Sequence, residues 1–185
     1  MMMKKLILPL QACAAPVASA LRIVLMTILL ASWYSPVDCN AQSAEEQQVK
    51  AVVEQLFRAM ELGDSSLAHK CFMPQVTTAT VKTSKEELNI LTRENGVAEF
   101  LKAIGTPHSD KWYEEIWNVK ITMDGALAQV WCDYAFYLGN KFSHCGVDAF
   151  HLFNDKGTWK IFHLADTRKA TGCNIPQEIA AKHAQ

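Results

Sequence analysis

The sequence predicts an α+β domain in which helices early in the chain cover one face of an antiparallel sheet. Two observations lead to this fold class. Tight-turn sequences divide residues 112–168 into consecutive strand-like segments, and apolar residues before them recur at helical spacing. Because each kind of segment has one apolar face, the two faces are expected to pack together.

The composition is that of a globular protein with a targeting segment. The chain has 185 residues, of which 50% are hydrophobic and 20% charged, and its formal net charge is −1. It contains no basic run, so we expect no nucleic-acid partner.

Residues 1–41 are predicted to be a signal peptide. Basic residues precede an apolar run at 23–30, and Cys39-Asn40-Ala41 places small residues at the cleavage-determining positions. The apolar run is shorter than the roughly 20 residues that a membrane span needs. A second pattern at Ala18-Ser19-Ala20 leaves the true start codon open. We expect a periplasmic or secreted protein that begins at Gln42 and has no membrane partner after cleavage.

Two helices are expected next. Ser43 and Glu46 form a capping box, and the apolar stripe that follows ends at Gly63. Asp64 can cap a second, shorter helix that Pro74 would stop.

A short hairpin and a third helix complete the covering layer. Thr77–Val81 is rich in β-branched residues and favours a strand. Residues 86–92 are ambiguous between helix and strand, and the apolar residues after Gly96 predict a third short helix.

Three turns set the expected register of the sheet. An Asp-Gly pair at 124–125, a Gly-Asn pair at 139–140 and a loop that ends at Gly157 each join two strands. Read this way, Met123 faces Ala126, Leu138 faces Lys141, and Phe153 faces Thr158.

This register sorts side chains onto two faces because they alternate along a strand. The first face is apolar in its middle and is the expected core. The second face carries four large apolar residues, which we expect to form a homodimer interface: Trp131, Phe150, Trp159 and Ile161. Asp148 and His163 should also meet on the second face, as a structural pair rather than a general base.

Polar groups gather at one end of the first face. Tyr134, Cys145 and Asp166 fall on adjacent strands, and Arg168 follows at the strand end. A mostly apolar pocket with a few convergent polar groups is typical of a small-molecule site. We therefore predict these four residues as ligand-binding, with no catalytic residue, metal or cofactor assigned.

Four cysteines remain after cleavage at Ala41: Cys71, Cys132, Cys145 and Cys173. They allow three fully paired arrangements, and the sequence does not choose among them. The expected diagonal separation of Cys132 and Cys145, about 7–8 Å, is at or beyond bridging reach.

The order of elements resembles the nuclear transport factor 2-like superfamily. Ser143-His144-Cys145-Gly146-Val147, then Trp159-Lys160-Ile161, then Asp166-Thr167-Arg168 are spaced as in exported bacterial members, some of which are labelled putative lumazine-binding. The resemblance implies a cone-shaped fold, with a strongly bent antiparallel sheet wrapped around N-terminal helices, over residues 42–170. Residues 171–185 would be a C-terminal tail.

The resemblance favours three functions. The leading hypothesis is an exported binding or accessory protein that holds a small hydrophobic or aromatic molecule without turnover. The alternative is an isomerase or dehydratase with Asp166 as base, for which a structural ion pair between Asp166 and Arg168 is the competing interpretation. A third hypothesis is a structural dimerisation module whose cone is filled by its own side chains.

Overall fold

A computed structural model of the protein describes residues 43–83 and 88–184. The predicted signal peptide lies outside the described residues. The described residues belong to one compact unit, Gln42–Gln185. Its elements, in order, are α2 (Ala44–Leu62), α3 (Ser65–His69), β1 (Phe72–Thr83), β2 (Asn89–Asn95), α4 (Ala98–Gly105), β3 (Trp112–Asp124), β4 (Leu127–Leu138), β5 (Lys141–Asp155), β6 (Thr158–Arg168) and α5 (Gln177–Lys182).

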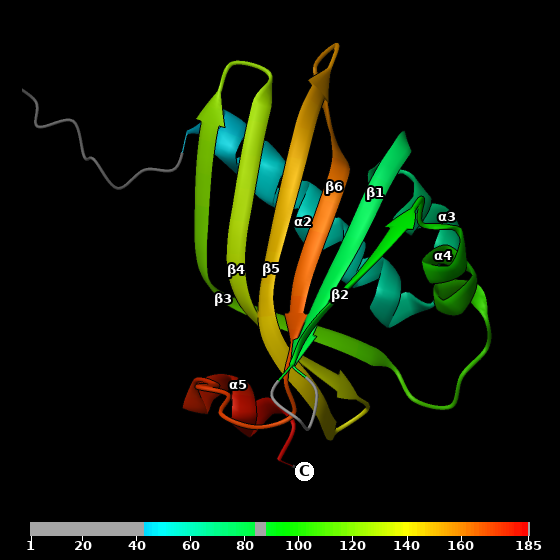
Figure 1. Ribbon diagram of the computed structural model, residues 1–185, viewed down its shortest axis with the longest axis vertical. Coiled ribbons are helices and arrows are strands. Elements are labelled where there is room, and N and C mark those ends of the chain that lie inside the picture. The colour runs from blue at the N-terminus through cyan, green and yellow to red at the C-terminus, as the bar shows by residue number, and fades with distance from the viewer. Residues whose placement is uncertain (1–42, 84–87, 185) are drawn as a thin grey trace, which may run out of the picture. The chain divides into compact units, whose positions relative to one another are not determined.

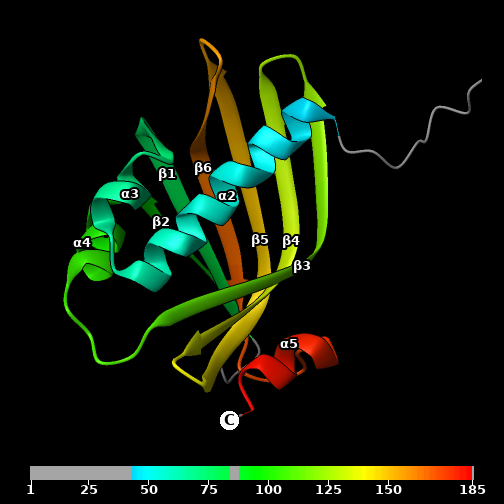
Figure 2. The same ribbon diagram turned by 180° about the vertical axis from the view of Figure 1, so that it is seen from behind.

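The strands form one six-stranded sheet in the order β2-β1-β6-β5-β4-β3. The sheet is strongly curled without closing, and α2 crosses its concave face while α3 and α4 lie beside β1 and β2 (Figures 1 and 2). The predicted α+β fold is thus confirmed. One detail differs: β1 pairs with β6 in parallel, so the sheet is mixed rather than antiparallel throughout.

The predicted start and end of the first helix are confirmed, whereas the predicted end of the second is not. The Ser43 hydroxyl accepts from the Glu46 backbone and the Glu46 side chain accepts from the Ser43 backbone, which completes the capping box. Gly63 ends α2 in the left-handed conformation at φ 67°. Val49, Val53 and Leu56 of this helix are buried against the sheet. Pro74 does not stop α3, because the strand β1 has already begun at Phe72.

The predicted register is confirmed at one turn and corrected at two. Leu138 faces Lys141 as expected. Asp124 faces Leu127, and Asp155 faces Thr158, so these two turns lie further along the chain than predicted. At the second of them Lys156 and Gly157 take φ 53° and 91°, and this left-handed pair closes a tighter turn than the expected loop.

Two irregularities in strand pairing then change which side chains face the core. The first lies between Phe136 and Tyr137 of β4, where Ser143 of β5 has no partner residue. The second lies between His151 and Leu152 of β5, where Phe162 of β6 is the extra residue. An extra residue in one strand reverses the alternation of its side chains beyond that point.

The predicted dimer patch is therefore wrong in its composition. Phe150, Trp159 and Ile161 are 1%, 3% and 0% exposed and lie in the main core of the protomer, whereas Trp131 is 46% exposed. The reversed alternation on β5 and β6 is the reason, since it carries these side chains to the concave face.

The C-terminal segment packs on the other face of the sheet. Cys145 and Cys173 form a disulfide. Ile179 of α5 is buried in a second apolar cluster with Tyr137 and Cys145, and α5 lies apart from the other helices, at the lower end of the sheet (Figure 1). The sequence did not predict this helix, because its six residues follow a short, weakly patterned stretch.

An ion pair, a hydrogen bond and an aromatic stack hold the same segment. Lys182 and His183 both contact the carboxylate of Glu115, at 2.7 and 3.2 Å. The His183 ring stacks on Tyr137 with ring centroids 3.9 Å apart. The tail is thus fixed to β3, β4 and β5 at once.

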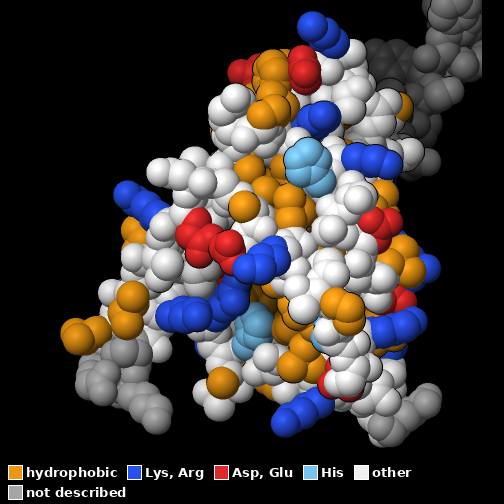
Figure 3. Space-filling model, turned by 90° about the vertical axis from the view of Figure 1, so that its right-hand side faces the viewer, with side chains coloured by type: hydrophobic (Ala, Val, Ile, Leu, Met, Phe, Trp, Pro, Cys, Tyr) orange, Lys and Arg blue, Asp and Glu red, His pale blue; other side chains and the backbone are white. Residues whose placement is uncertain are grey.

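The remaining surface has a mixed character. On the face shown in Figure 3, hydrophobic side chains lie along the middle, with basic and acidic side chains beside them. Among the described helices, none combines the length and apolar character that a membrane span requires.

Breaking the disulfide should destabilise the domain. Cys173→Ser opens a loop with a sequence separation of 28 residues, which should cost about 2–4 kcal/mol of unfolding free energy. Thermal unfolding in the absence of reductant measures the loss. Adding a reductant should lower the melting temperature of the wild type to that of the variant and leave the variant unchanged. A wild type insensitive to reductant would contradict this assignment of the bridge.

Candidate functional site

A pocket lies between the helices and the concave face of the sheet. Its volume is about 380 Å³, and its walls come from α2, α4 and every strand of the sheet. This volume is within the range of pockets that hold small molecules.

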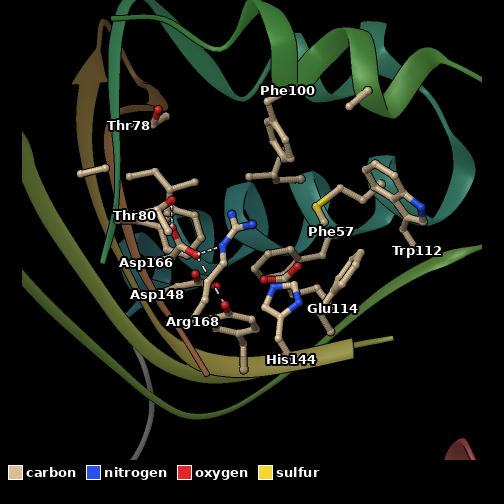
Figure 4. Close-up of a pocket in the computed structure, with 18 of the residues that line it drawn as sticks. Phe57, Thr78, Thr80, Phe100, Trp112, Glu114, His144, Asp148, Asp166 and Arg168 are labelled. Atoms are coloured by element: carbon tan, nitrogen blue, oxygen red, sulfur yellow. Dashed lines mark hydrogen bonds and ion pairs between the residues drawn. The ribbon is translucent and has the colours of Figure 1, made fainter. Parts of the chain in front are cut away.

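The sides of the pocket formed by α2, α4 and the start of β3 carry aromatic side chains. Figure 4 shows Phe57 of α2, Phe100 of α4 and Trp112 of β3 around the cavity, with ionisable side chains gathered along the sheet. Phe57 also packs edge-on against Phe150 of β5, with ring centroids 6.0 Å apart. The pocket therefore presents flat apolar surfaces opposite a polar floor.

Asp166 is the centre of one part of that floor. The Thr80 hydroxyl donates to its Oδ1 at 2.6 Å, and Arg168 Nε donates to its Oδ2 at 2.5 Å. The Tyr134 hydroxyl lies 3.5 Å from Oδ2 and donates to the Thr167 carbonyl at 2.9 Å. Burial alone would lower the pKa of Arg168, but the hydrogen bond and charge of Asp166 raise it. This part of the floor is a satisfied ion pair.

Glu114 and Asp148 form a second, less satisfied part. Burial, followed by the charge of Asp166, raises the pKa of Glu114 from 4.5 to about 8. Burial, followed by the charges of Glu114 and Asp166, also raises the pKa of Asp148. The contact between the two side chains raises the pKa of Asp148 and lowers that of Glu114, so the two carboxyl groups are linked. The pair thus holds a proton at neutral pH.

Asp148 is the most deeply buried of these groups. It is 3% exposed, and its Oδ2 has no hydrogen-bond partner within the described part of the chain. An unpaired buried polar atom is costly, and such atoms in native proteins call for a partner.

Two neighbouring groups are held neutral. Burial lowers the pKa of His144, and the charge of Arg168 lowers it further. Burial raises the pKa of Tyr134, and the charges of the nearby carboxylates add to this effect. His144 and Tyr134 pack edge to face, with ring centroids 5.7 Å apart, so two uncharged polar rings lie side by side at the pocket floor.

Three of the four predicted ligand-binding residues line the pocket: Tyr134, Asp166 and Arg168. Cys145 does not. It lies on the opposite face in the disulfide with Cys173, because the irregularity at Ser143 turns its neighbour His144 toward the pocket instead.

Glu114, His144 and Asp148 also line the pocket, although the sequence did not predict them there. The predicted register placed Asp148 on the outer face beside His163. In the structure, His163 Nδ1 instead forms a hydrogen bond with the Thr77 hydroxyl at 2.8 Å, and its ring stacks on that of His151. Glu114 stands in a run without alternation, and only the register with Phe136 places it inside. No local signal marks either residue.

Metal binding finds no support in this arrangement. Over the described residues, 43–83 and 88–184, no group of three or more His, Cys, Asp or Glu side chains is placed to hold a metal ion.

Residues 44–163 match the model of a protein family described as "Putative lumazine-binding", which is more than half of the chain. No curated protein matches the sequence.

Solved structures share the fold at low identity. An NTF2-like protein with a cystatin-like fold from Novosphingobium aromaticivorans is 11% identical, with a TM-score of 0.56 over 94% of this chain and 99% of that one. A putative dehydratase of the NTF2-like family from Streptomyces avermitilis is 14% identical, with a TM-score of 0.53 over 68% and 96%. A putative scytalone dehydratase, also from Novosphingobium aromaticivorans, is 11% identical, with a TM-score of 0.54 over 71% and 89%. These likenesses show the NTF2-like fold alone.

The raised pKa of Glu114 should make stability depend on pH. Its pKa is about 8 in the folded protein and 4.5 as the ordinary value, so the folded state binds more protons between these limits. The resulting stability is fully present below about pH 4.5 and is lost as the pH rises through about 8. Melting temperatures measured across this interval should fall, and Glu114→Gln should flatten the fall.

A matched control is Glu54→Gln, which removes an exposed carboxylate of α2 that pairs with Lys50. The melting temperature of this variant should fall with pH as steeply as that of the wild type. A Glu114→Gln variant with the full wild-type slope would show that Glu114 does not titrate in this range.

Proposed function

Because the chain belongs to the family described as "Putative lumazine-binding", we propose that it binds a small, partly aromatic molecule in this pocket without converting it. The observation that carries the proposal is the cavity of about 380 Å³, which the protein's own side chains leave open. Aromatic walls opposite a polar floor suit a flat molecule with polar substituents. The open cavity also argues against the hypothesis of a purely structural module with a filled cone.

Blocking the cavity tests this proposal. Ala103 of α4 lines the pocket, so Ala103→Phe should fill part of it and weaken ligand binding by at least about ten-fold, equal to 1.4 kcal/mol. Mass spectrometry of small molecules that co-purify, followed by melting shifts with a panel of aromatic heterocycles, would measure binding. The matched control is Ala98→Phe, at an exposed position of the same helix. Equal binding by both variants would place the ligand elsewhere.

Acid–base catalysis is the second candidate, and the Glu114–Asp148 pair is the observation that favours it. The pKa of Glu114, about 8, lies nearer to neutral pH than that of an ordinary carboxyl group, as a general acid or base requires, and burial also raises the pKa of Asp148. Asp166, the base expected from the sequence, already accepts hydrogen bonds from Thr80 and Arg168. The test is product formation from small carbonyl compounds. If Asp148→Asn abolishes product formation but retains binding, the protein is an enzyme.

Export is part of the proposal and rests on the sequence of residues 1–41. The mature protein should begin at Gln42, which its intact mass would reveal. The disulfide between Cys145 and Cys173 is compatible with an oxidising compartment.

We also propose a homodimer, with the convex face of the sheet around Trp131 as its contact. Leu127 of β4 and Phe153 of β5 are 49% and 41% exposed and face each other, and β4 also carries Trp131. Trp131→Glu should shift size-exclusion elution toward a monomer, whereas Leu91→Glu, on β2, should not. A wild type that elutes as a monomer at every concentration would exclude the dimer.

A further inference from the structure

We propose that the ligand of this pocket is a cation that carries N–H groups, such as an aromatic amidinium or a protonated aromatic amine, held by Asp148 and Glu114. This inference rests on the proposed function, since it names the chemical class of the molecule bound there. Four features of the described residues support it: the excess of carboxyl groups in the pocket, the unpaired Asp148 Oδ2, the aromatic walls, and the ion pair that Asp166 and Arg168 make with each other.

The charge balance of the pocket is acidic. Among its described lining residues, five carry carboxyl groups and only Arg168 carries a permanent positive charge. Two of the five, Glu94 and Glu99, are exposed, and Glu99 lies 3.7 Å from Lys102. Of the inner three, Asp166 is paired with Arg168. Glu114 and Asp148 make no ion pair with the described residues. The charge of Arg168 lowers the pKa of both, but its guanidinium is already bound to Asp166.

The unpaired oxygen defines what the ligand must offer. Asp148 Oδ2 is buried and accepts no hydrogen bond from the described residues. A carboxylate oxygen is satisfied by a donor, and a charged donor makes the stronger bond. A quaternary ammonium has charge but no hydrogen to donate, so an N–H-bearing cation fits better.

The aromatic walls favour the same class of ligand. The negative faces of aromatic rings attract a cation, and the attraction grows when the site is shielded from water. Phe57, Phe100, Trp112 and Phe136 all line this pocket, and Trp112 packs edge-on against Phe136 with ring centroids 5.8 Å apart. Rings on one side and carboxyl groups on the other would enclose a flat cation.

The neighbouring charged and titratable groups do not supply the missing charge. His144 of β5 is held neutral by burial and by Arg168, because both lower its pKa. Tyr134 of β4 keeps its proton, because burial and the nearby carboxylates raise its pKa. The three residues of α2 that line the pocket, Leu56, Phe57 and Met60, are all uncharged. A bound cation is therefore the group that would compensate the pair.

Binding should release a proton. The pair of Glu114 and Asp148 holds a proton at neutral pH because burial raises the pKa of both groups. A cation placed against the pair favours the ionised form, so the proton leaves to solvent as the ligand binds. A neutral ligand would leave the proton in place.

Four ligands of similar shape test the inference on the full protein. Benzamidine is a cation with N–H groups, phenyltrimethylammonium is a cation without them, benzamide is neutral, and benzoate is an anion. Isothermal titration calorimetry at neutral pH in phosphate and in Tris gives both affinity and proton release, because these buffers differ in ionisation enthalpy. Benzamidine should bind at least about ten-fold more tightly than any of the others, as a charge-assisted hydrogen bond predicts. Its binding should release a proton, which benzamide and benzoate should not.

Two variants locate the effect. Asp148→Asn and Glu114→Gln keep the shape of each side chain, and each should remove the preference for benzamidine over benzamide together with the proton release. The control Glu54→Gln should change neither. Thermal unfolding confirms that each variant is folded, and Glu114→Gln, at a less buried position, serves where Asp148→Asn fails to fold.

The outcomes separate this inference from the function on which it rests. Benzamide or benzoate binding as tightly as benzamidine would overturn the cation preference and leave a small-molecule binder. Cation binding that both variants retain would overturn the role of the carboxyl pair. Failure of all four compounds and of the broader heterocycle panel to bind would overturn the binding function itself.

Discussion

The register between β4 and β5 is the constraint on which the rest of this structure depends. Because Ser143 has no partner on β4, His144 and Asp148 face the cavity while Cys145 faces outward. The same stretch of β5 therefore supplies the pocket floor on one side and the anchor of the C-terminal segment on the other. Shifting this pairing by one residue would exchange the two roles, bury the disulfide cysteine in the pocket and expel the carboxyl group of Asp148.

Placing carboxyl groups in such a pocket is costly, and the protein offsets the cost in two different ways. Asp166 keeps its charge, since Arg168 and Thr80 both donate to it. Asp148 has no cation of its own, so its pKa rises and a proton takes the place of a partner. The first solution gives a rigid, permanently ionised pair. The second leaves a group whose charge depends on what occupies the cavity, which is why ligand binding and proton binding are linked at this site.

The parts of this fold that could be predicted from the sequence are those with local causes. The capping box at Ser43, the left-handed end of α2 at Gly63 and the turn at Leu138 each depend on a few neighbouring residues. The parallel pairing of β1 with β6 joins residues such as Thr80 and Asp166, far apart in the chain, and no local pattern encodes it. The unpaired residues Ser143 and Phe162 were missed for the same reason. An extra residue is visible only once its partner strand is known. Ser143 sufficed to move Cys145 out of the predicted site and Asp148 into it, and Phe162 moved Trp159 and Ile161 into the core.

Gly146 shows how closely the site depends on backbone packing. A Cβ atom at this position would lie 1.8 Å from the carbonyl oxygen of Thr167, far inside contact distance, so only glycine lets β5 and β6 approach here. That same carbonyl accepts the Tyr134 hydroxyl at 2.9 Å, and the Thr167 hydroxyl accepts from the Val147 backbone at 3.0 Å. The close approach thus brings the end of β6 within reach of Tyr134 and holds Asp166 and Arg168, on either side of Thr167, against the pocket floor. Any larger residue at 146 would separate the two strands, and the ion pair would move away from the Glu114–Asp148 pair whose protonation it influences.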